Sequence, residues 1–215
     1  MSSIDQYDQL CELANTPATI SIVGGQNTTK STLANAITGH ARNEVFKSGE
    51  GRVTQSIKKL LHNNAQYIDT PGRGLMPMDD DEAQSVFKST DIFIFTHRAD
   101  SGELDKEELA LLEKTQELKN SSLIFALTAY EGKSKEGIRK IISKIKSQLI
   151  ETGFCDTPII PVSCDMHYSG IELNCKELKA SSGVSAITSL IDEYSVYVIG
   201  KREQKFSQAK FNIYK

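Results

Sequence analysis

A Gly-rich turn that ends in Lys30 and Ser31 follows a short apolar run at residues 18–23, and a helical pattern comes after it. A strand, a turn and a helix in this order are typical of a phosphate-binding loop, in which backbone N–H groups and the helix N-terminus face phosphate oxygens. We expect Lys30 to contact the β- and γ-phosphates and Ser31 to bind Mg²⁺ through its hydroxyl. The residues expected to hold the phosphates are Gly24, Gly25, Gln26, Asn27, Thr28, Thr29, Lys30, Ser31 and Thr32.

Thr29 is the position at which the chain departs from this pattern, which places Gly directly before the Lys. A β-branched residue resists unusual backbone angles and crowds the phosphate. Nucleotide binding is nevertheless the leading interpretation of the loop.

A second candidate motif follows another strand-like run and reads Asp69-Thr70-Pro71-Gly72. A carboxylate at Asp69 can organise water on Mg²⁺, and the Gly72 N–H can meet a γ-phosphate without obstruction, although the same residue types suit a simple turn. The segment 47–54 is polar and lacks periodicity, which predicts a mobile loop. Thr54 ends that loop, and a Thr at the start of a strand is by itself common.

Two stretches carry a family resemblance. Residues 27–39 resemble the Asn-x-Gly-Lys-Ser-Thr-Leu-x-Asn-x-Leu-x-Gly segment of Era-type GTPases, and residues 23–27 are similar to the Val-Gly-Gly-Gln-Ser opening of the dynamin superfamily. Residues 53–54 fit the first switch of the dynamin superfamily, and residues 69–72 fit both groups. The resemblance covers residues 18–200 and implies a G domain that binds and hydrolyses GTP, with Mg²⁺ held by Ser31, Thr54 and Asp69.

The resemblance also implies an Asn/Thr-Lys-x-Asp motif after the fifth strand, whose carboxylate binds guanine. This chain has Thr128-Ala129-Tyr130-Glu131 at that place. Glu131 is therefore the candidate carboxylate beside Thr128, and Ala129 replaces the Lys whose stem would cover the base. Ser163-Cys164 resembles the final Ser-Ala motif, which touches the guanine oxygen.

Hydrolysis needs a group that orients the attacking water, and no Gln closely follows Gly72. The resemblance implies that Gln26 takes this role and that Asn27 binds a monovalent cation such as K⁺, whose charge favours the transition state. Arg52 and Arg73 are alternatives, and Gln26 and Asn27 also suit an ordinary turn. We hypothesise slow basal hydrolysis that is stimulated by K⁺ and by the pairing of two G domains.

Alternating strand-like and helix-like segments predict the scaffold for these side chains. The expected fold class is α/β: a three-layer P-loop NTPase G domain with a mostly parallel six-stranded sheet, helices on both faces and the site at the carboxyl ends of the strands. His62-Asn-Asn-Ala predicts a hairpin between the second and third strands, so one edge strand should be antiparallel. The predicted strands are 18–23, 56–61, 65–69, 91–96, 122–127 and 158–162.

Helices are predicted from caps and from apolar spacing. A helix at 31–38 should end at Gly39, and Asp105-x-x-Glu108 predicts a capping box that opens a helix to about residue 118. Two apolar stripes at helical spacing should face the core: Ile138, Ile141, Ile142, Ile145 and Leu149, and Val184, Ile187, Ile191, Tyr194 and Val198.

We divide the chain into a short N-terminal helix at 1–17, the G domain at 18–200 and a basic-aromatic tail at 201–215. The tail suits either a membrane- or partner-facing segment or a helix that packs its aromatic side chains and exposes its lysines. The 215 residues leave no room for the stalk of dynamins or the second domain of Era-type proteins. We therefore expect a minimal protein, a fragment, or half of an assembly that a partner completes.

Composition excludes several classes of protein. A net charge of −3 offers no bulk attraction to nucleic acid. The chain has neither an apolar run of membrane-spanning length nor a signal-peptide pattern, so we expect a cytoplasmic protein. Cys164-x-x-His167 could be half of a metal site with Cys155 and Cys175, but reduced thiols are the simpler interpretation.

The expected function is that of a regulatory or mechanochemical GTPase of the dynamin/Era type. Two other classes stay open. One is a nucleotide-binding switch without hydrolysis, which Thr29 and Ala129 favour. The other is an ATP-dependent P-loop protein.

Overall fold

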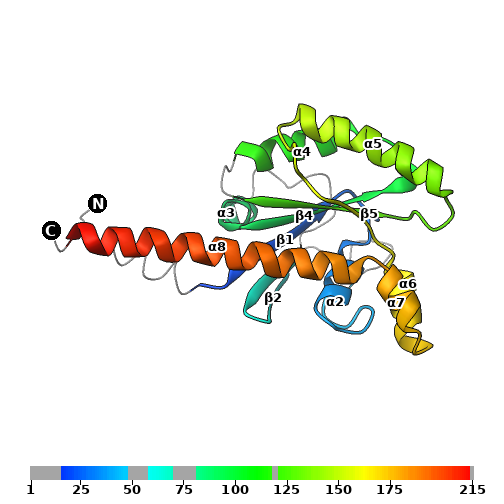
Figure 1. Ribbon diagram of the computed structural model, residues 1–215, viewed down its shortest axis with the longest axis horizontal. Coiled ribbons are helices and arrows are strands. Elements are labelled where there is room, and N and C mark those ends of the chain that lie inside the picture. The colour runs from blue at the N-terminus through cyan, green and yellow to red at the C-terminus, as the bar shows by residue number, and fades with distance from the viewer. Residues whose placement is uncertain (1–15, 48–57, 70–80, 118–120, 214–215) are drawn as a thin grey trace.

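The computed structural model describes residues 16–47, 58–69, 81–117 and 121–213, which fold around one six-stranded sheet (Figure 1). The strands lie in the order β2-β3-β1-β4-β5-β6. Only the β2–β3 pair is antiparallel among the strand pairs of this described sheet. The predicted mostly parallel sheet is therefore confirmed, with strands β1 (Ala18–Gly24), β2 (Lys58–His62), β3 (Ala65–Asp69), β4 (Ile92–Arg98), β5 (Ser122–Thr128) and β6 (Ile159–Pro161).

The predicted hairpin joins β2 to β3 through Asn63 and Asn64. Both asparagines have positive φ, 45° and 58°. A two-residue turn with positive φ at both positions matches the twist of an antiparallel pair, and Asn tolerates this backbone region. The sequence signal and the structure agree here because the signal is local.

Helices cover both faces of the sheet, and each face buries its own apolar cluster (Figure 1). On one face α2, α6 and α8 pack over side chains such as Ile20, Ile94 and Ile124. On the other face α3, α4 and α5 pack over side chains such as Phe93, Phe95 and Phe125. The helices are α2 (Lys30–Ile37), α3 (Asp81–Ser89), α4 (Lys106–Glu117), α5 (Lys135–Glu151), α6 (Cys164–Glu172), α7 (Lys176–Ser181) and α8 (Val184–Ile213), and Ala99–Ser101 forms a short 3₁₀ helix.

The predicted helix signals act where they were expected. Asp105 and Glu108 form the capping box of α4: the Asp105 N–H donates to Glu108 Oε2 at 3.1 Å, and the Glu108 N–H donates to Asp105 Oδ1 at 2.8 Å. Gly39 follows α2 with a φ of 72°, as a helix-ending glycine does. The apolar stripes of α5 and α8 face the two clusters.

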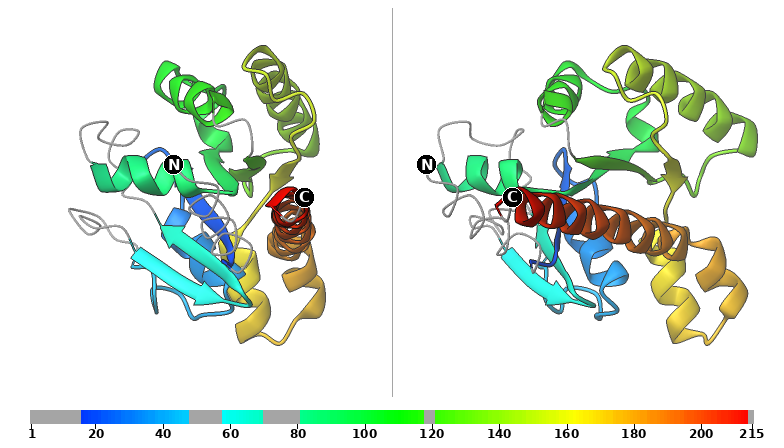
Figure 2. Two further views of the ribbon diagram at one scale, coloured as in Figure 1. Left: turned by 90° about the vertical axis from the view of Figure 1, so that its left-hand side faces the viewer. Right: turned by 60° about the vertical axis from the view of Figure 1, so that its left-hand side comes forward.

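Residues 201–213, set apart above as a tail, continue α8, which is a single helix of 30 residues. Figure 2 shows α8 running past the sheet, with α6 and α7 at its N-terminal end. Arg202 attaches the helix to the sheet, since its Nη2 donates to both carboxylate oxygens of Asp91 at 2.7 and 2.6 Å. Residues 1–15 of the expected N-terminal helix lie outside the described residues. No helix in the described part is long and apolar enough to cross a membrane.

Candidate functional site

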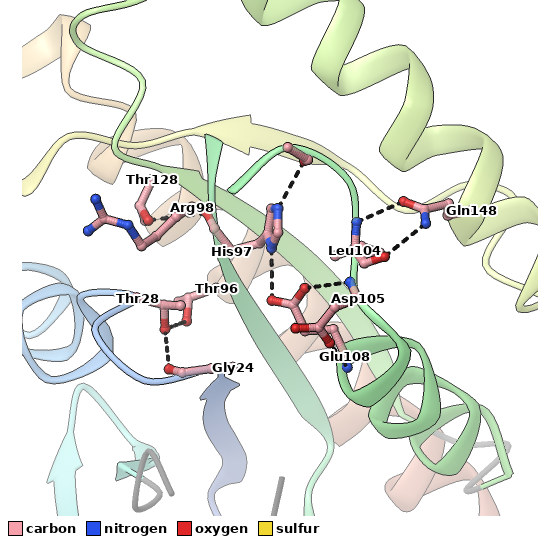
Figure 3. Close-up of polar contacts among 12 residues, drawn as sticks. Gly24, Thr28, Thr96, His97, Arg98, Leu104, Asp105, Glu108, Thr128 and Gln148 are labelled. Carbon is pink, nitrogen blue, oxygen red and sulfur yellow. Dashed lines mark hydrogen bonds and ion pairs between the residues drawn. The ribbon is translucent and has the colours of Figure 1, made fainter. Parts of the chain in front are cut away.

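The loop between β1 and α2 is held against β4 by close backbone packing. Gly24 has a φ of 143°, and a Cβ there would lie 2.3 Å from the Thr96 carbonyl oxygen and 2.4 Å from Thr96 Oγ1. Thr28 and Thr96 share a hydrogen bond between their hydroxyls at 2.7 Å (Figure 3). Only glycine fits at residue 24, and the Thr28–Thr96 contact fixes the far side of the loop.

Thr29 adopts a left-handed backbone conformation, which a β-branched residue resists. It occupies the N-cap position of α2 with φ 65° and ψ 20°, in the left-handed region. Its hydroxyl donates to the neighbouring Thr28 carbonyl at 2.6 Å, so it is turned away from the N–H groups of the helix. The loop therefore keeps the backbone shape of a Gly-containing loop, and the β-branched residue is strained in it.

Lys30 extends back over the loop from the first position of α2. Its Nζ donates to the carbonyl oxygens of Gly24 at 3.1 Å and Gly25 at 2.6 Å. Burial lowers the pKa of Lys30, and the nearby carboxylate of Asp69 opposes that change. The ammonium group is thus enclosed by the loop in which the phosphates are expected to bind.

Ser31 and Asp69, predicted as Mg²⁺ ligands from different parts of the chain, are in direct contact. The Ser31 hydroxyl donates to Asp69 Oδ2 at 2.7 Å, and the other carboxylate oxygen, Oδ1, is buried without a hydrogen-bond partner among the described residues. Burial raises the pKa of Asp69, against the lowering effects of the Ser31 hydrogen bond and of Lys30 and Lys58. A buried carboxylate oxygen without a partner, beside a hydroxyl, fits the oxygen ligands that Mg²⁺ prefers.

For each of the remaining predicted phosphate and Mg²⁺ residues, either its position alone does not identify a role or it lies outside the described residues. The side chains of Gln26 and Asn27 are exposed on the loop, and Thr32 is buried in α2. Thr54 and Gly72, predicted for Mg²⁺ and the γ-phosphate, lie outside the described residues, as do the alternatives Arg52 and Arg73.

The base-binding candidates gather at the carboxyl ends of β5 and β6. The Thr128 hydroxyl donates to the His97 carbonyl at 3.1 Å, so it supports the end of β4. Ala129 has a φ of 54°, and Glu131 is exposed two residues later. Ser163 Oγ accepts the Met166 N–H as the N-cap of α6 at 3.1 Å, and this bond uses the hydroxyl as a helix cap.

The cysteines do not gather with His167 into a recognisable metal site. Cys164 is buried, and burial raises the pKa of its thiol to about 12, whereas Cys155 is exposed. No group of three possible His, Cys, Asp or Glu ligands occurs within the described ranges. Cys164 begins α6, directly after its N-cap Ser163.

Sequence reasoning missed the residues that end β4. His97 is 1% exposed, its Nδ1 lies 2.8 Å from Glu108 Oε1, and its Nε2 lies 3.1 Å from the Gly102 carbonyl oxygen (Figure 3). Arg98 follows and donates from Nη1 to the Asn27 carbonyl at 3.3 Å. Their one sequence signal was that polar residues end an otherwise apolar strand.

Comparisons with known proteins agree with this arrangement. Residues 19–150 match the protein family described as "50S ribosome-binding GTPase". An uncharacterised protein of Acinetobacter baylyi is 26% identical over 178 residues, which are 81% of this chain and 42% of the relative. The chain thus spans less than half of that relative's length.

The fold is shared with translation factors. Elongation factor SelB of Methanococcus maripaludis, solved with the GTP analogue GppNHp, superposes with a TM-score of 0.56 at 18% identity, over 83% of this chain and 34% of SelB. A bacterial selenocysteine-specific elongation factor, EF-Sec, gives a TM-score of 0.57 at 14% identity, over 83% of this chain and 28% of that factor. At these identities the likeness concerns the fold alone.

Proposed function

The chain is a member of the 50S ribosome-binding GTPase family, and from this premise we propose that it binds GTP and hydrolyses it to GDP with Mg²⁺. The observation that carries the proposal is the convergence of Lys30, Ser31 and Asp69 at the N-terminus of α2. A helix N-terminus, an ammonium group and a buried carboxylate are the three components that a metal-bound polyphosphate needs.

Each of these residues has a distinct task in the proposed reaction. Lys30 exchanges its hydrogen bonds with Gly24 and Gly25 for the β- and γ-phosphates, where its charge opposes the negative charge of the transition state. Ser31 and Asp69 would hold Mg²⁺, which would supply positive charge beside the phosphates. We assign Thr54 and Gly72 to the metal and the γ-phosphate on resemblance alone.

Glu131 is the proposed reader of guanine, since it follows β5 at the edge where the base is expected. Its two oxygens would accept the ring N–H and the amino group of guanine. The Thr128 hydroxyl donates to a backbone carbonyl at the end of β4. We assign the guanine oxygen to the backbone N–H of Cys164, because the Ser163 N–H already donates to the Ser182 carbonyl at 2.8 Å. Glu131→Ala should weaken GTP binding and leave ATP binding unchanged.

We further propose the mechanism suggested by the resemblance to dynamin- and Era-type enzymes. Gln26 orients the attacking water, and Asn27 helps to bind K⁺ when two G domains pair across their nucleotide faces. The exposure of both side chains on the loop is compatible with these roles. Phosphate release should therefore be faster in KCl than in choline chloride at matched ionic strength and should rise with protein concentration. A rate per molecule that ignores both conditions would eliminate this mechanism.

Binding without hydrolysis is the second candidate function, and one observation favours it. Thr29 holds a left-handed backbone directly before Lys30, and its hydroxyl donates to the Thr28 carbonyl. Such a loop can bind a nucleotide and still misplace the γ-phosphate for attack, because reaction requires a narrow range of geometries.

The decisive experiment is titration calorimetry with GDP, GTP and ATP in Mg²⁺, followed by measurement of phosphate release. Lys30→Ala should weaken guanine nucleotide binding by about ten- to a hundredfold, since a hydrogen bond to a charged group contributes about 1.5–3 kcal/mol. Lys140→Ala is the matched control, because Lys140 is exposed on α5 and pairs with Glu136 at 2.8 Å. Equal affinities for the wild type and Lys30→Ala would refute the assignment of the loop. Guanine nucleotide binding without phosphate release would favour the second candidate function.

A further inference from the structure

Arg98 connects the two halves of the proposed nucleotide site. It is the last residue of β4 and is paired in register with Thr128, the last residue of β5, so both lie at the same carboxyl edge. Its Nη1 donates to the Asn27 carbonyl of the phosphate loop at 3.3 Å. Figure 3 shows Arg98 and Thr128 together at this edge, near the loop that leads from Gly24 to Thr28.

Asp100 fixes the plane of the Arg98 guanidinium. Arg98 Nε donates to Asp100 Oδ1 at 2.9 Å, and Nη2 donates to Oδ2 at 2.5 Å. Two parallel hydrogen bonds to one carboxylate orient a guanidinium more strictly than a single contact does. Because Asp100 lies only two residues further along the chain, this orientation costs little additional ordering.

In this orientation the Arg98 guanidinium keeps N–H donors that neither Asp100 nor Asn27 uses. Of the five N–H donors of a guanidinium, one on Nε and one on Nη2 are taken by Asp100, and one on Nη1 is taken by Asn27. The side chain is 35% exposed, so part of the planar group faces solvent.

Glu131 lies close enough to act on Arg98 electrostatically. The hydrogen bond to Asp100 raises the pKa of Arg98 most, and the charge of Glu131 adds to the effect. Between Thr128 and Glu131 the chain has Ala129, whose side chain ends at Cβ. A nucleotide with its phosphates at Lys30 and its base at Glu131 must therefore pass Arg98.

We propose that Arg98 packs its guanidinium against the face of the nucleobase and so supplies the cover that Ala129 cannot. This inference rests on the proposed nucleotide-binding function. A guanidinium attracts the face of any aromatic ring, so the contact strengthens binding without selecting the base. Arg98 and Glu131 then have separate roles: Arg98 contributes affinity through the base plane, and Glu131 contributes selectivity through the base edge.

The test compares ligands with and without a base. Titration calorimetry would use GDP, inosine diphosphate and inorganic pyrophosphate with the wild type, Arg98→Ala and Arg98→Lys. We expect Arg98→Ala to lower the affinity for both nucleoside diphosphates by about tenfold, which corresponds to the loss of one desolvated cation–π contact. The affinity for pyrophosphate should not change. Arg98→Lys keeps the positive charge but lacks the planar guanidinium, so it should regain little affinity. Arg139→Ala, on the exposed surface of α5, is the matched control.

Each other outcome overturns the inference. An equal loss for pyrophosphate would mean that Arg98 supports the phosphate loop instead of the base. A loss for GDP but not for inosine diphosphate would place Arg98 at the base edge. If Arg98→Lys bound GDP as tightly as the wild type, the charge of residue 98 alone would account for the affinity. A wild type that binds pyrophosphate but not GDP would instead refute the proposed function itself.

Discussion

Thr29 and Asn27 both hold a positive φ in the phosphate loop, 65° and 57°, and Thr29, which is β-branched, is the more strained of the two. A left-handed backbone costs an L-amino acid with a Cβ about 1–2 kcal/mol, while Gly adopts it freely at an entropic cost. We predict that Thr29→Gly raises the unfolding free energy by about 1 kcal/mol, as measured by urea denaturation. It should also tighten GDP binding, because glycine holds the left-handed backbone before Lys30 without strain.

Asn63→Gly in the hairpin is the appropriate comparison for this change. Asn63 also has a positive φ, 45°, but Asn tolerates the region, so its replacement should change stability little. If Thr29→Gly weakened GDP binding, the threonine would be an adapted contact and not a defect.

Asp69 should make stability depend on pH and on Mg²⁺. Burial raises the pKa of Asp69 in the folded protein. Between the ordinary pKa and this raised value the folded state binds more protons than the unfolded chain, so stability is lost as pH rises through the folded pKa. We predict that Asp69→Asn removes this loss and makes the protein more stable than the wild type at neutral pH without metal.

Thermal unfolding with GDP, with and without Mg²⁺, completes this measurement. Mg²⁺ should raise the midpoint of the wild type and have no effect on Asp69→Asn, since a ligand stabilises only the state that binds it. A metal-dependent shift that survives the substitution would remove Asp69 from the metal site.

The candidate site was predictable where its residues belong to short motifs. Lys30 and Ser31 open α2 directly after the loop that follows β1, and Asp69 ends β3, which pairs parallel with β1. The roles of His97 and Arg98 were not predictable, because they depend on which strand lies beside the loop and on the register of β4 with β5. Such contacts join residues far apart in the sequence, which local patterns do not encode.

Among the structural elements, β4 and α4 are joined by a buried contact between His97 Nδ1 and Glu108 Oε1 at 2.8 Å. Burial by itself lowers the pKa of His97, but the hydrogen bond and the charge of Glu108 outweigh it, so the pKa lies above its ordinary value. Because the Gly102 carbonyl can only accept, Nε2 carries a proton, and below the raised pKa a second N–H, on Nδ1, donates to Glu108.

Glu108→Gln tests this pair, since Gln can still serve in the capping box with Asp105. A raised histidine pKa gives stability that is present below the ordinary pKa and is lost as pH rises through the folded value. We predict that the variant is less stable than the wild type by about 2 kcal/mol at pH 6, with a smaller difference at pH 9, as measured by denaturant unfolding. Glu107→Gln, on the exposed side of the same helical turn, should show no such pH dependence.

The elements themselves were largely predictable because their signals are periodic. The alternation of apolar runs located all six strands, and caps and apolar stripes located α2, α4, α5 and the first half of α8. Strand ends were less certain: β6 keeps only Ile159–Pro161 of the expected 158–162. Strand length depends on partners, and β6 has one neighbour in the described sheet, β5.

At the scale of the whole molecule, Arg202 adds a polar attachment of α8 to the sheet beyond the apolar packing of the first half of the helix. The side chains of Arg202 and Asp91 are 11% and 15% exposed, and Arg202 also donates to the Thr16 carbonyl at 3.0 Å. Asp91 in turn accepts the Thr19 N–H at 2.8 Å, so one ion pair joins the helix to the starts of β1 and β4. We predict that Arg202→Ala lowers the unfolding free energy by about 2 kcal/mol and speeds amide exchange in the second half of α8.

Lys205→Ala, one helical turn further along and exposed, is the control for this change. GDP affinity should be the same in both variants, because Arg202 lies at the opposite ends of the strands from Lys30. A loss of GDP affinity in Arg202→Ala alone would instead show that the attachment of α8 is coupled to the nucleotide site.

The two edges of the sheet have a consequence for how copies of this protein behave in concentrated solution. One edge, β6, has three residues and ends at Pro161, which has no N–H to offer a strand from another molecule. The other edge, β2, begins with Lys58 and Lys59, and charged lysines on an edge repel the close approach of a second sheet. Within the described part of the chain, growth of the sheet from one molecule into the next is therefore disfavoured at both ends, which protects an apolar parallel sheet from aggregation.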